Sequence, residues 1–143
     1  MNRTTIASSL KRLSVVALPA TPGGSSTENA SLVKAATGGP VALYAEFTAL
    51  PEHADAVEAL IAGLARDVRQ EPGNLIFEPH RRVSNPAAFF VYEVYRNADA
   101  FQAHITAPYG AVFNAALGDL IEGTGSELTW LTPVSAEAVI PAV

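Results

Sequence analysis

The sequence predicts an α+β fold whose elements follow the order β-α-β-β-α-β. Residues 41–50 alternate between apolar and other side chains with the period of a β-strand. Residues 51–70 repeat apolar side chains at helical spacing. Two further strand-like runs occupy residues 74–83 and 87–96, and the Ser-Asn-Pro sequence at 84–86 between them indicates a β-hairpin.

The first strand and the first helix each have one apolar face. Alternation places one set of strand residues on the same side of the sheet: Val41, Leu43, Ala45 and Phe47. The helix begins at Pro51, carries acids in its first turn and arginines in its last, and ends at the Glu-Pro-Gly sequence of residues 71–73. Its apolar stripe consists of Val57, Leu60, Ile61, Leu64 and Val68.

The second helical part is predicted as two segments. Asn97 is a suitable N-cap for a short helix over residues 99–105, and Pro108 begins a second helix that runs to residue 122. A last strand over residues 126–134 closes the domain. The apolar side of the second segment is expected to hold Val112, Phe113, Ala116, Leu117 and Leu120. This order is that of the ferredoxin-like split β-α-β-β-α-β fold, with an antiparallel sheet and both helical parts on one face.

The other face of the predicted sheet needs a cover. The side chains expected there would leave a large apolar patch in water: Tyr44, Ile76, Phe90, Tyr92 and Val94. We therefore expect a homodimer that packs sheet against sheet. The C-terminal residues 133–143 would be available to cross onto the partner.

Composition excludes several classes of protein. The 143 residues include no cysteine, so a disulfide scaffold, a thiolate zinc site, an iron–sulfur cluster and a cysteine nucleophile are excluded. Hydrophobic residues make up 49% of the chain, yet no apolar run approaches the ~20 residues that span a bilayer. We expect a soluble protein with no membrane partner.

Residues 1–39 differ from the rest and are predicted to be an N-terminal extension, with the domain at 40–143. They are rich in Ser, Thr, Ala, Gly and Pro, which suits a linker or a tail draped on a partner. Residues 1–40 hold four basic side chains against Glu28, a charge of +3, so the rest of the chain, at −5 overall, carries −8. Such an acidic body argues against nucleic-acid binding. The expected compartment is the cytoplasm, with organelle targeting or export through the extension as the alternative.

Two stretches carry a family resemblance: EPGNLIFEPHRR, and VYEVYRNADAFQAHITAPYGAVFNAAL. They resemble the antibiotic biosynthesis monooxygenase family of dimeric α/β barrels, which includes quinol and polyketide-aromatic oxygenases, and the resemblance covers residues 41–132. The order Y-E-x-aromatic, a gap and A-H-x-x-x-P is matched by Tyr92, Glu93, Tyr95, Ala103, His104 and Pro108.

The chain departs from its relatives at two places. Many of them have a second histidine where this chain has Tyr109. The haem-degrading branch of the fold carries Asn, Trp and His where this chain has Phe47, Tyr95 and Asn114, which makes haem degradation a minor alternative.

His104 is the leading candidate for a catalytic group. It shares a helical face with Phe101 that should look toward the sheet, and an imidazole there, opposite a carboxylate, is a suitable general base. Glu93 alternates onto the same side and is expected to orient His104. The alternatives are a pairing with Arg96 or with an arginine of a partner chain, or a dimer contact. A buried structural histidine is the competing interpretation.

Aromatic side chains would line the pocket for a flat ligand, with ordinary core packing as the alternative: Phe47, Tyr95, Phe101, Tyr109 and Trp130. Glu78 and His80 alternate on one strand face but lack a third ligand, so no metal site is expected. The sequence contains no dinucleotide or phosphate loop, and we expect no cofactor.

The resemblance therefore implies a cofactor-independent monooxygenase acting on a quinol or related phenolic compound. In the absence of a cofactor the aromatic substrate itself must supply the electrons that reduce dioxygen. The alternatives are a non-catalytic dimeric ligand-binding or stress-associated domain, and an isomerase of a small keto or sugar-like signal.

Overall fold

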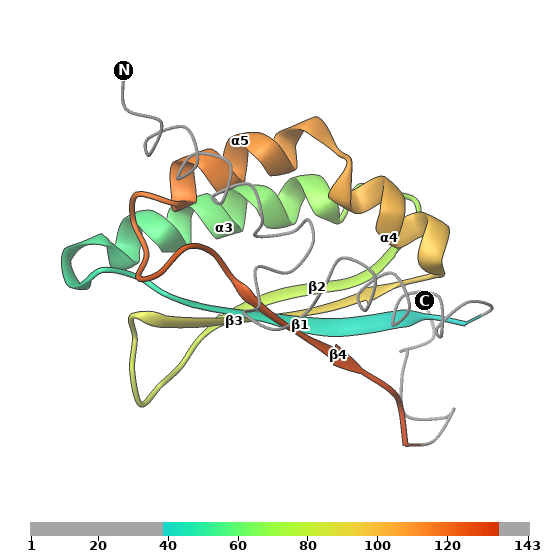
Figure 1. The fold of residues 1–143 in the computed structure, drawn as a ribbon, viewed down its shortest axis with the longest axis horizontal. Coiled ribbons are helices and arrows are strands. Elements are labelled where there is room, and N and C mark those ends of the chain that lie inside the picture. The colour runs from blue at the N-terminus through green and yellow to red at the C-terminus, as the bar shows by residue number, and fades with distance from the viewer. Residues whose placement is uncertain (1–38, 135–143) are drawn as a thin grey trace.

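A four-stranded antiparallel sheet with its helices on one face forms the body of the chain (Figure 1). The structure is a computed structural model and describes residues 39–134. The strands are β1 (Val41–Thr48), β2 (Asn74–Arg81), β3 (Ala88–Tyr95) and β4 (Glu127–Leu131). The helices are the 3₁₀ turn η1 (Pro51–His53), α3 (Ala54–Val68), α4 (Ala98–Ile105) and α5 (Pro108–Leu117). This arrangement confirms the predicted ferredoxin-like order of elements.

The strands lie in the order β2-β3-β1-β4, and every neighbouring pair is antiparallel. The register aligns Phe77, Glu93, Leu43 and Trp130 in one row across the four strands. Because side chains alternate between the faces of a sheet, this row shares a face with the core residues of β1. Glu93 therefore lies under the helices, as predicted from its position in β3.

The core lies between this face and the helices. The predicted inner face of β1 is confirmed, since Val41, Leu43, Ala45 and Phe47 are all buried. The C-terminal end of α3 is tied to the sheet by Arg69, whose Nε and Nη2 both donate to the carbonyl oxygen of Phe77 at 3.0 and 2.8 Å. The stripe that α3 buries consists of Val57, Ile61, Leu64, Ala65 and Val68.

The second helical part differs from its prediction. The helix that begins at Pro108 ends at Leu117 rather than at residue 122. Its inner side holds Phe113 and Leu117 as predicted, but Val112 is 72% exposed and Ala116 is also exposed. Apolar side chains surround this helix, so hydrophobicity alone did not identify the buried stripe of Gly110, Phe113, Asn114 and Leu117.

The outer face of the sheet carries the predicted aromatic residues. Tyr44, Phe90 and Tyr92 are half-buried, and the rings of Tyr44 and Phe90 lie 4.8 Å apart. Val94 was expected to be exposed with them, but it is fully buried at 0% between Ala42 and Ile76. The extension predicted at 1–39 lies outside the described residues except for Gly39, and the tail at 133–143 lies outside them beyond Val134.

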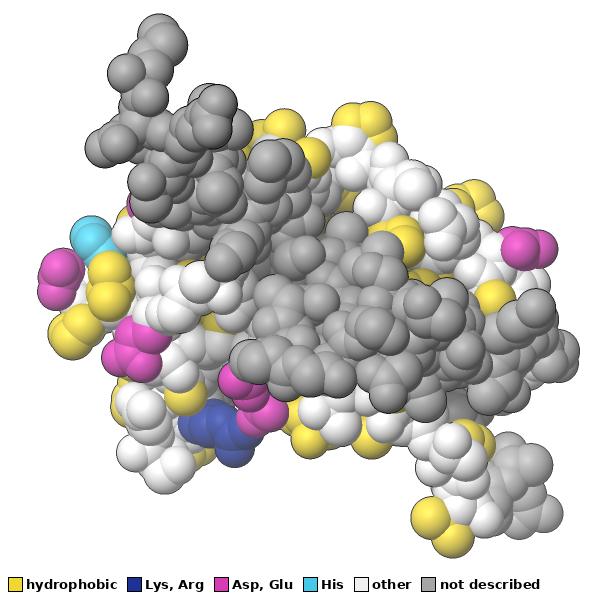
Figure 2. Space-filling view, in the orientation of Figure 1, with side chains coloured by type: hydrophobic (Ala, Val, Ile, Leu, Met, Phe, Trp, Pro, Cys, Tyr) yellow, Lys and Arg dark blue, Asp and Glu magenta, His cyan; other side chains and the backbone are white. Residues whose placement is uncertain are grey.

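Acidic side chains gather on the visible surface at the end of the sheet where β1 leads into α3 (Figure 2).

Within residues 39–134, no helix has the length and the apolar character needed to cross a membrane.

Gly73 permits the close packing of α4 on the turn between α3 and β2. A Cβ atom at this position would overlap the Cβ of Ala100 and lie 3.2 Å from its Cα. We expect Gly73→Ala to lower the free energy of unfolding by about 1 to 3 kcal/mol, because the turn and α4 must move apart. Urea denaturation measures this change. Gly110→Ala is the control: its Cβ would meet no atom within 4 Å, and alanine favours a helix over glycine by about 1 kcal/mol. Equal stability of the two variants would contradict the packing argument.

Candidate functional site

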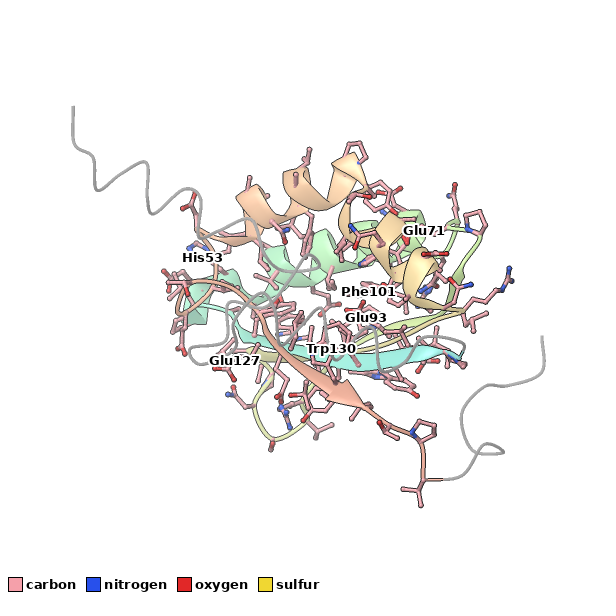
Figure 3. All side chains as sticks on the ribbon, turned by 45° about the vertical axis from the view of Figure 1, so that its right-hand side comes forward. His53, Glu71, Glu93, Phe101, Glu127 and Trp130 are labelled. Atoms are coloured by element: carbon pink, nitrogen blue, oxygen red, sulfur yellow. The ribbon has the colours of Figure 1, made fainter. Side chains whose placement is uncertain are left out.

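A cluster of buried polar side chains occupies one end of the interface between α4 and the sheet. Figure 3 shows Glu71, Glu93, Phe101 and Trp130 gathered there, whereas His53 lies at the opposite end. His104 extends into the cluster from α4, whose first turn is capped by the Asn97 side chain accepting from the Ala100 amide at 2.8 Å. Phe101 and His104, three residues apart, form the buried side of this helix.

The imidazole of His104 is held by a carboxylate that the sequence did not point to. His104 is 1% exposed, and its Nδ1 lies 2.9 and 3.0 Å from the two carboxylate oxygens of Glu71. A carboxylate only accepts hydrogen bonds when ionised, so the Nδ1–H of His104 donates to Glu71. In the neutral ring this places the free lone pair on Nε2.

Nε2 of His104 faces the second carboxylate of the cluster. It lies 3.8 Å from Oε2 of Glu93 and has no hydrogen-bond partner among the described residues. Glu93 is buried, and its Oε2 accepts a hydrogen bond of 2.7 Å from the Tyr95 hydroxyl. Burial raises the pKa of Glu93 from 4.5 to about 7, although the charge of His104 and the Tyr95 hydrogen bond act in the opposite direction.

Two tyrosines complete the cluster as hydrogen-bond donors. Burial and the neighbouring Glu93 raise the pKa of Tyr95 well above its ordinary value. Tyr109 donates to Oε2 of Glu71, and burial together with this hydrogen bond raises the pKa of Tyr109. Both phenols therefore stay protonated at neutral pH. Hydrogen bonds thus join Tyr109, Glu71 and His104 into one set and Tyr95 and Glu93 into another, and the two sets face each other across the 3.8 Å between Nε2 of His104 and Glu93.

Of the five aromatic residues proposed as pocket walls, four lie at this end of the sheet. The ring of Tyr95 is 4.7 Å from that of His104, and Phe101 is 6.2 Å from it. Trp130 meets Phe101 edge to face at 5.2 Å, and its Nε1 has no hydrogen-bond partner in the described part of the chain. Phe47 is elsewhere: it stacks on Phe89 at 5.4 Å and lines a separate hollow near the end of β1.

Glu71 is the member of the cluster that sequence reasoning missed. Its Glu-Pro-Gly context indicates only the end of a helix, and it lies 33 residues from His104 in the chain. Glu93 was expected to orient His104, but it lies 3.8 Å from Nε2, and the orienting hydrogen bond comes from Glu71. The alternative pairing of Glu93 with Arg96 is not seen. No local pattern could have joined Glu71 to His104.

Other charged groups have structural partners. Arg81 binds Asp55 and Glu58 at 3.1 and 2.5 Å. His80 and Glu78 lie 3.8 Å apart and are both exposed. Among residues 39–134, no three His, Asp or Glu side chains are grouped as a metal site would require.

The comparisons with known proteins agree with this architecture. The family model of the antibiotic biosynthesis monooxygenases matches residues 40–116. A solved structure of PA3566 from Pseudomonas aeruginosa is 24% identical, with a TM-score of 0.64 and coverage of 69% of this chain and 98% of that one. Rv0793 from Mycobacterium tuberculosis is 24% identical, with a TM-score of 0.63 over 69% and 99% of the two chains.

A protein from Caulobacter crescentus described as a putative antibiotic biosynthesis monooxygenase is 26% identical. Its TM-score is 0.63, and the match covers 68% of this chain and 92% of that one. No curated protein sequence is significantly similar to the chain.

The raised pKa of Glu93 predicts a slope in stability with pH. Between 4.5 and about 7 the folded chain holds a proton on Glu93 that the unfolded chain has released. The contribution of Glu93 to the free energy of unfolding is therefore fully present below pH 4.5. It falls by on the order of 3 kcal/mol as the pH rises to about 7. Glu93→Gln should remove this fall, and urea denaturation between pH 5 and pH 8 measures it. Glu78→Gln, at an exposed site, is the control. If the free energy of unfolding depended on pH in the same way in Glu93→Gln, the Glu93 carboxyl of the folded native chain would be ionised over the whole range from pH 5 to pH 8.

Proposed function

The chain belongs to the antibiotic biosynthesis monooxygenase family, and from this premise we propose that it is a cofactor-independent monooxygenase acting on a quinol or related phenolic compound. Family membership supports a monooxygenase-like function. A phenolic substrate is proposed because its phenolate is electron-rich enough to reduce dioxygen without a cofactor. His104 is proposed as the general base, with Glu71 as its positioning residue.

The observation that carries the proposal is the state of the two ring nitrogens of His104. Nδ1 is bound to Glu71, while Nε2 has no hydrogen-bond partner among the described residues. A carboxylate on one nitrogen fixes the tautomer and stabilises the imidazolium that forms when the other nitrogen takes a proton. This arrangement supports proton abstraction at Nε2, where a phenolic hydroxyl would donate.

The proposed reaction inserts one atom of dioxygen into the aromatic ring. Nε2 of His104 takes the phenolic proton, and the resulting electron-rich phenolate reduces dioxygen directly. One oxygen atom forms a bond to a ring carbon, and the other leaves as water with two substrate hydrogens. A quinol and dioxygen thus yield a hydroxyquinone and water. The substrate supplies the electrons, and the chain supplies the base and the exclusion of water.

Access to Nε2 requires movement of neighbouring side chains, because His104 is 1% exposed. Tyr95 of β3 and Phe101 of α4 contact the imidazole ring, and Trp130 of β4 packs against Phe101. We propose that they form the aromatic wall against which the ring of the substrate packs. Tyr109 supports Glu71 rather than the substrate, since its hydroxyl is engaged with that carboxylate.

A non-catalytic role is the second candidate. It is favoured by the complete burial of His104 and Glu93, because buried polar clusters also serve to fix a unique packing. In that case the chain would bind small aromatic molecules without turnover. Dioxygen consumption separates the two candidates.

We also propose that the chain forms a homodimer through the outer face of the sheet. Tyr44, Phe90 and Tyr92 form a half-buried aromatic surface on that face, opposite the helices. Burying such a surface between two copies is favourable because it removes apolar area from water.

Light scattering at micromolar concentration tests this assembly. The native chain should have the mass of a dimer, and Tyr92→Glu should produce a monomer, because two carboxylates would be buried at the two-fold contact. Val83→Glu adds the same charge on a fully exposed side chain outside the sheet and should leave the dimer intact. A monomeric native chain would contradict the proposal.

Variants at His104 and Glu71 test the reaction itself. With hydroquinone or 1,4-dihydroxynaphthalene as the substrate, His104→Ala should lower the rate of dioxygen consumption by ~10²-fold or more. His104→Asn keeps a donor and similar volume without basicity, so it should restore stability but not rate. Glu71→Gln should lower the rate by about tenfold or more, because the imidazolium loses its counter-charge.

His53→Gln is the matched control, since His53 lies at the opposite end of the fold and contacts Glu52. Its rate should equal that of the native chain. Native rates in all of the His104 and Glu71 variants would remove the general base from the mechanism. Ligand binding without dioxygen consumption by the native chain would favour the second candidate.

A further inference from the structure

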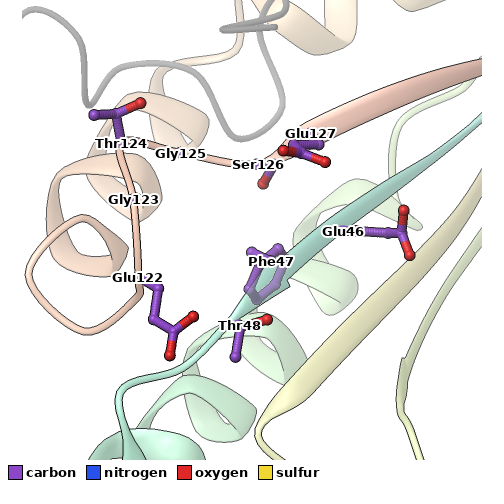
Figure 4. A pocket seen from close by; sticks show the side chains of 9 residues that line it. All are labelled: Glu46, Phe47, Thr48, Glu122, Gly123, Thr124, Gly125, Ser126 and Glu127. Carbon is purple, nitrogen blue, oxygen red and sulfur yellow. The ribbon is translucent and has the colours of Figure 1, made fainter.

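A hollow lies beside the last residues of β1, away from the His104 cluster. Ile121 forms an isolated bridge with Ala49, the residue after β1, and the chain next pairs with β1 where Glu127 meets Glu46. Between these points, residues 122–126 loop away from β1 and border an open hollow of about 520 Å³ (Figure 4). Phe47 lies on this side of β1, four residues from Leu43, the neighbour of Glu93. At ~3.3 Å per strand residue the hollow is roughly 13 Å from the cluster.

The hollow is acidic. Three carboxylates line it, from Glu46, Glu122 and Glu127, and none of the residues 39–134 that line it is a lysine, arginine or histidine. Glu46 is bound to Arg82, whereas Glu122 and Glu127 form no ion pair with any residue of the described part. Glu46 and Glu127 are directly opposite each other in the strand register, where like charges repel.

A buried hydroxyl in the same place has no partner. Ser126 is 1% exposed, and its Oγ makes no hydrogen bond with the described residues. Figure 4 shows this oxygen pointing from the loop toward Phe47, with Glu122 at the other end of the loop. A buried polar group without a partner is unfavourable, and a ligand that donates a hydrogen bond would satisfy it.

We propose that this hollow binds an organic cation, an ammonium or guanidinium group carried on a short apolar stem. The carboxylates of Glu122 and Glu127 and the hydroxyl of Ser126 would accept hydrogen bonds from its N–H groups. The ring of Phe47 would contact the stem and the cation. An organic cation suits the hollow better than a metal ion, because no three His, Asp or Glu side chains of residues 39–134 are grouped to hold one.

Titration of the full chain with n-butylammonium, followed through its backbone amide NMR signals, tests this site. The signals of Gly123, Gly125 and Ser126 should shift and saturate, and the binding should weaken with added salt. The neutral analogue 1-butanol should produce no saturable shift. Equal binding of both probes would show an apolar hollow only and overturn the proposal. Tighter binding of calcium at the same amides would overturn the assigned class of ligand.

Variants then identify the groups that bind the probe. Ser126→Ala and Glu122→Gln should each weaken binding of n-butylammonium by about three- to tenfold, the range of one hydrogen bond or one partly exposed charge pair. Glu78→Gln, on the strand at the other edge of the sheet, should leave the affinity unchanged. Glu122 is exposed, so Glu122→Gln should fold normally. Unchanged affinity in both Ser126→Ala and Glu122→Gln would overturn the proposal.

Discussion

The hydrogen bond between Glu71 and the imidazole of His104 is the contact on which the candidate site depends. It joins the turn after α3 to the buried side of α4, across 33 residues of chain. The same turn provides Gly73, whose missing side chain admits Ala100 of α4 and whose carbonyl oxygen accepts from the amide of Arg96 at 2.8 Å. One short segment therefore positions the helix, orients the imidazole and anchors the end of β3.

The two carboxylates around His104 have different environments. Glu71 is half-buried and receives hydrogen bonds from both His104 and Tyr109. Glu93 lies at the bottom of the cluster, where burial raises its pKa to about 7. Two acids of the same type thus flank one imidazole: Glu71 accepts its hydrogen bond, and Glu93 is the buried group with the raised pKa.

The two faces and the two ends of the sheet carry side chains of different kinds. The inner face carries the row that contains Glu93 and Trp130, and the outer face carries the aromatic surface of Tyr44, Phe90 and Tyr92. At the far end, the loop after Ile121 separates from β1 and exposes acidic side chains around the hydroxyl of Ser126. The strand period of two explains how a single sheet can present such different surfaces on opposite faces.

Local sequence patterns predicted the order of the elements, the inner face of β1, and the placement of Glu93 and His104 between the sheet and the helices. These features follow from local periodicity, which is set by residues close together in the chain. The packing of whole elements brings Glu71 to His104 and Tyr109 to Glu71, and it places Phe47 by the acidic hollow rather than beside His104. It also decided which side of α5 is buried, because apolar residues surround that helix. Contacts between residues 33 and 38 positions apart are fixed by packing of whole elements, which leaves no local signature.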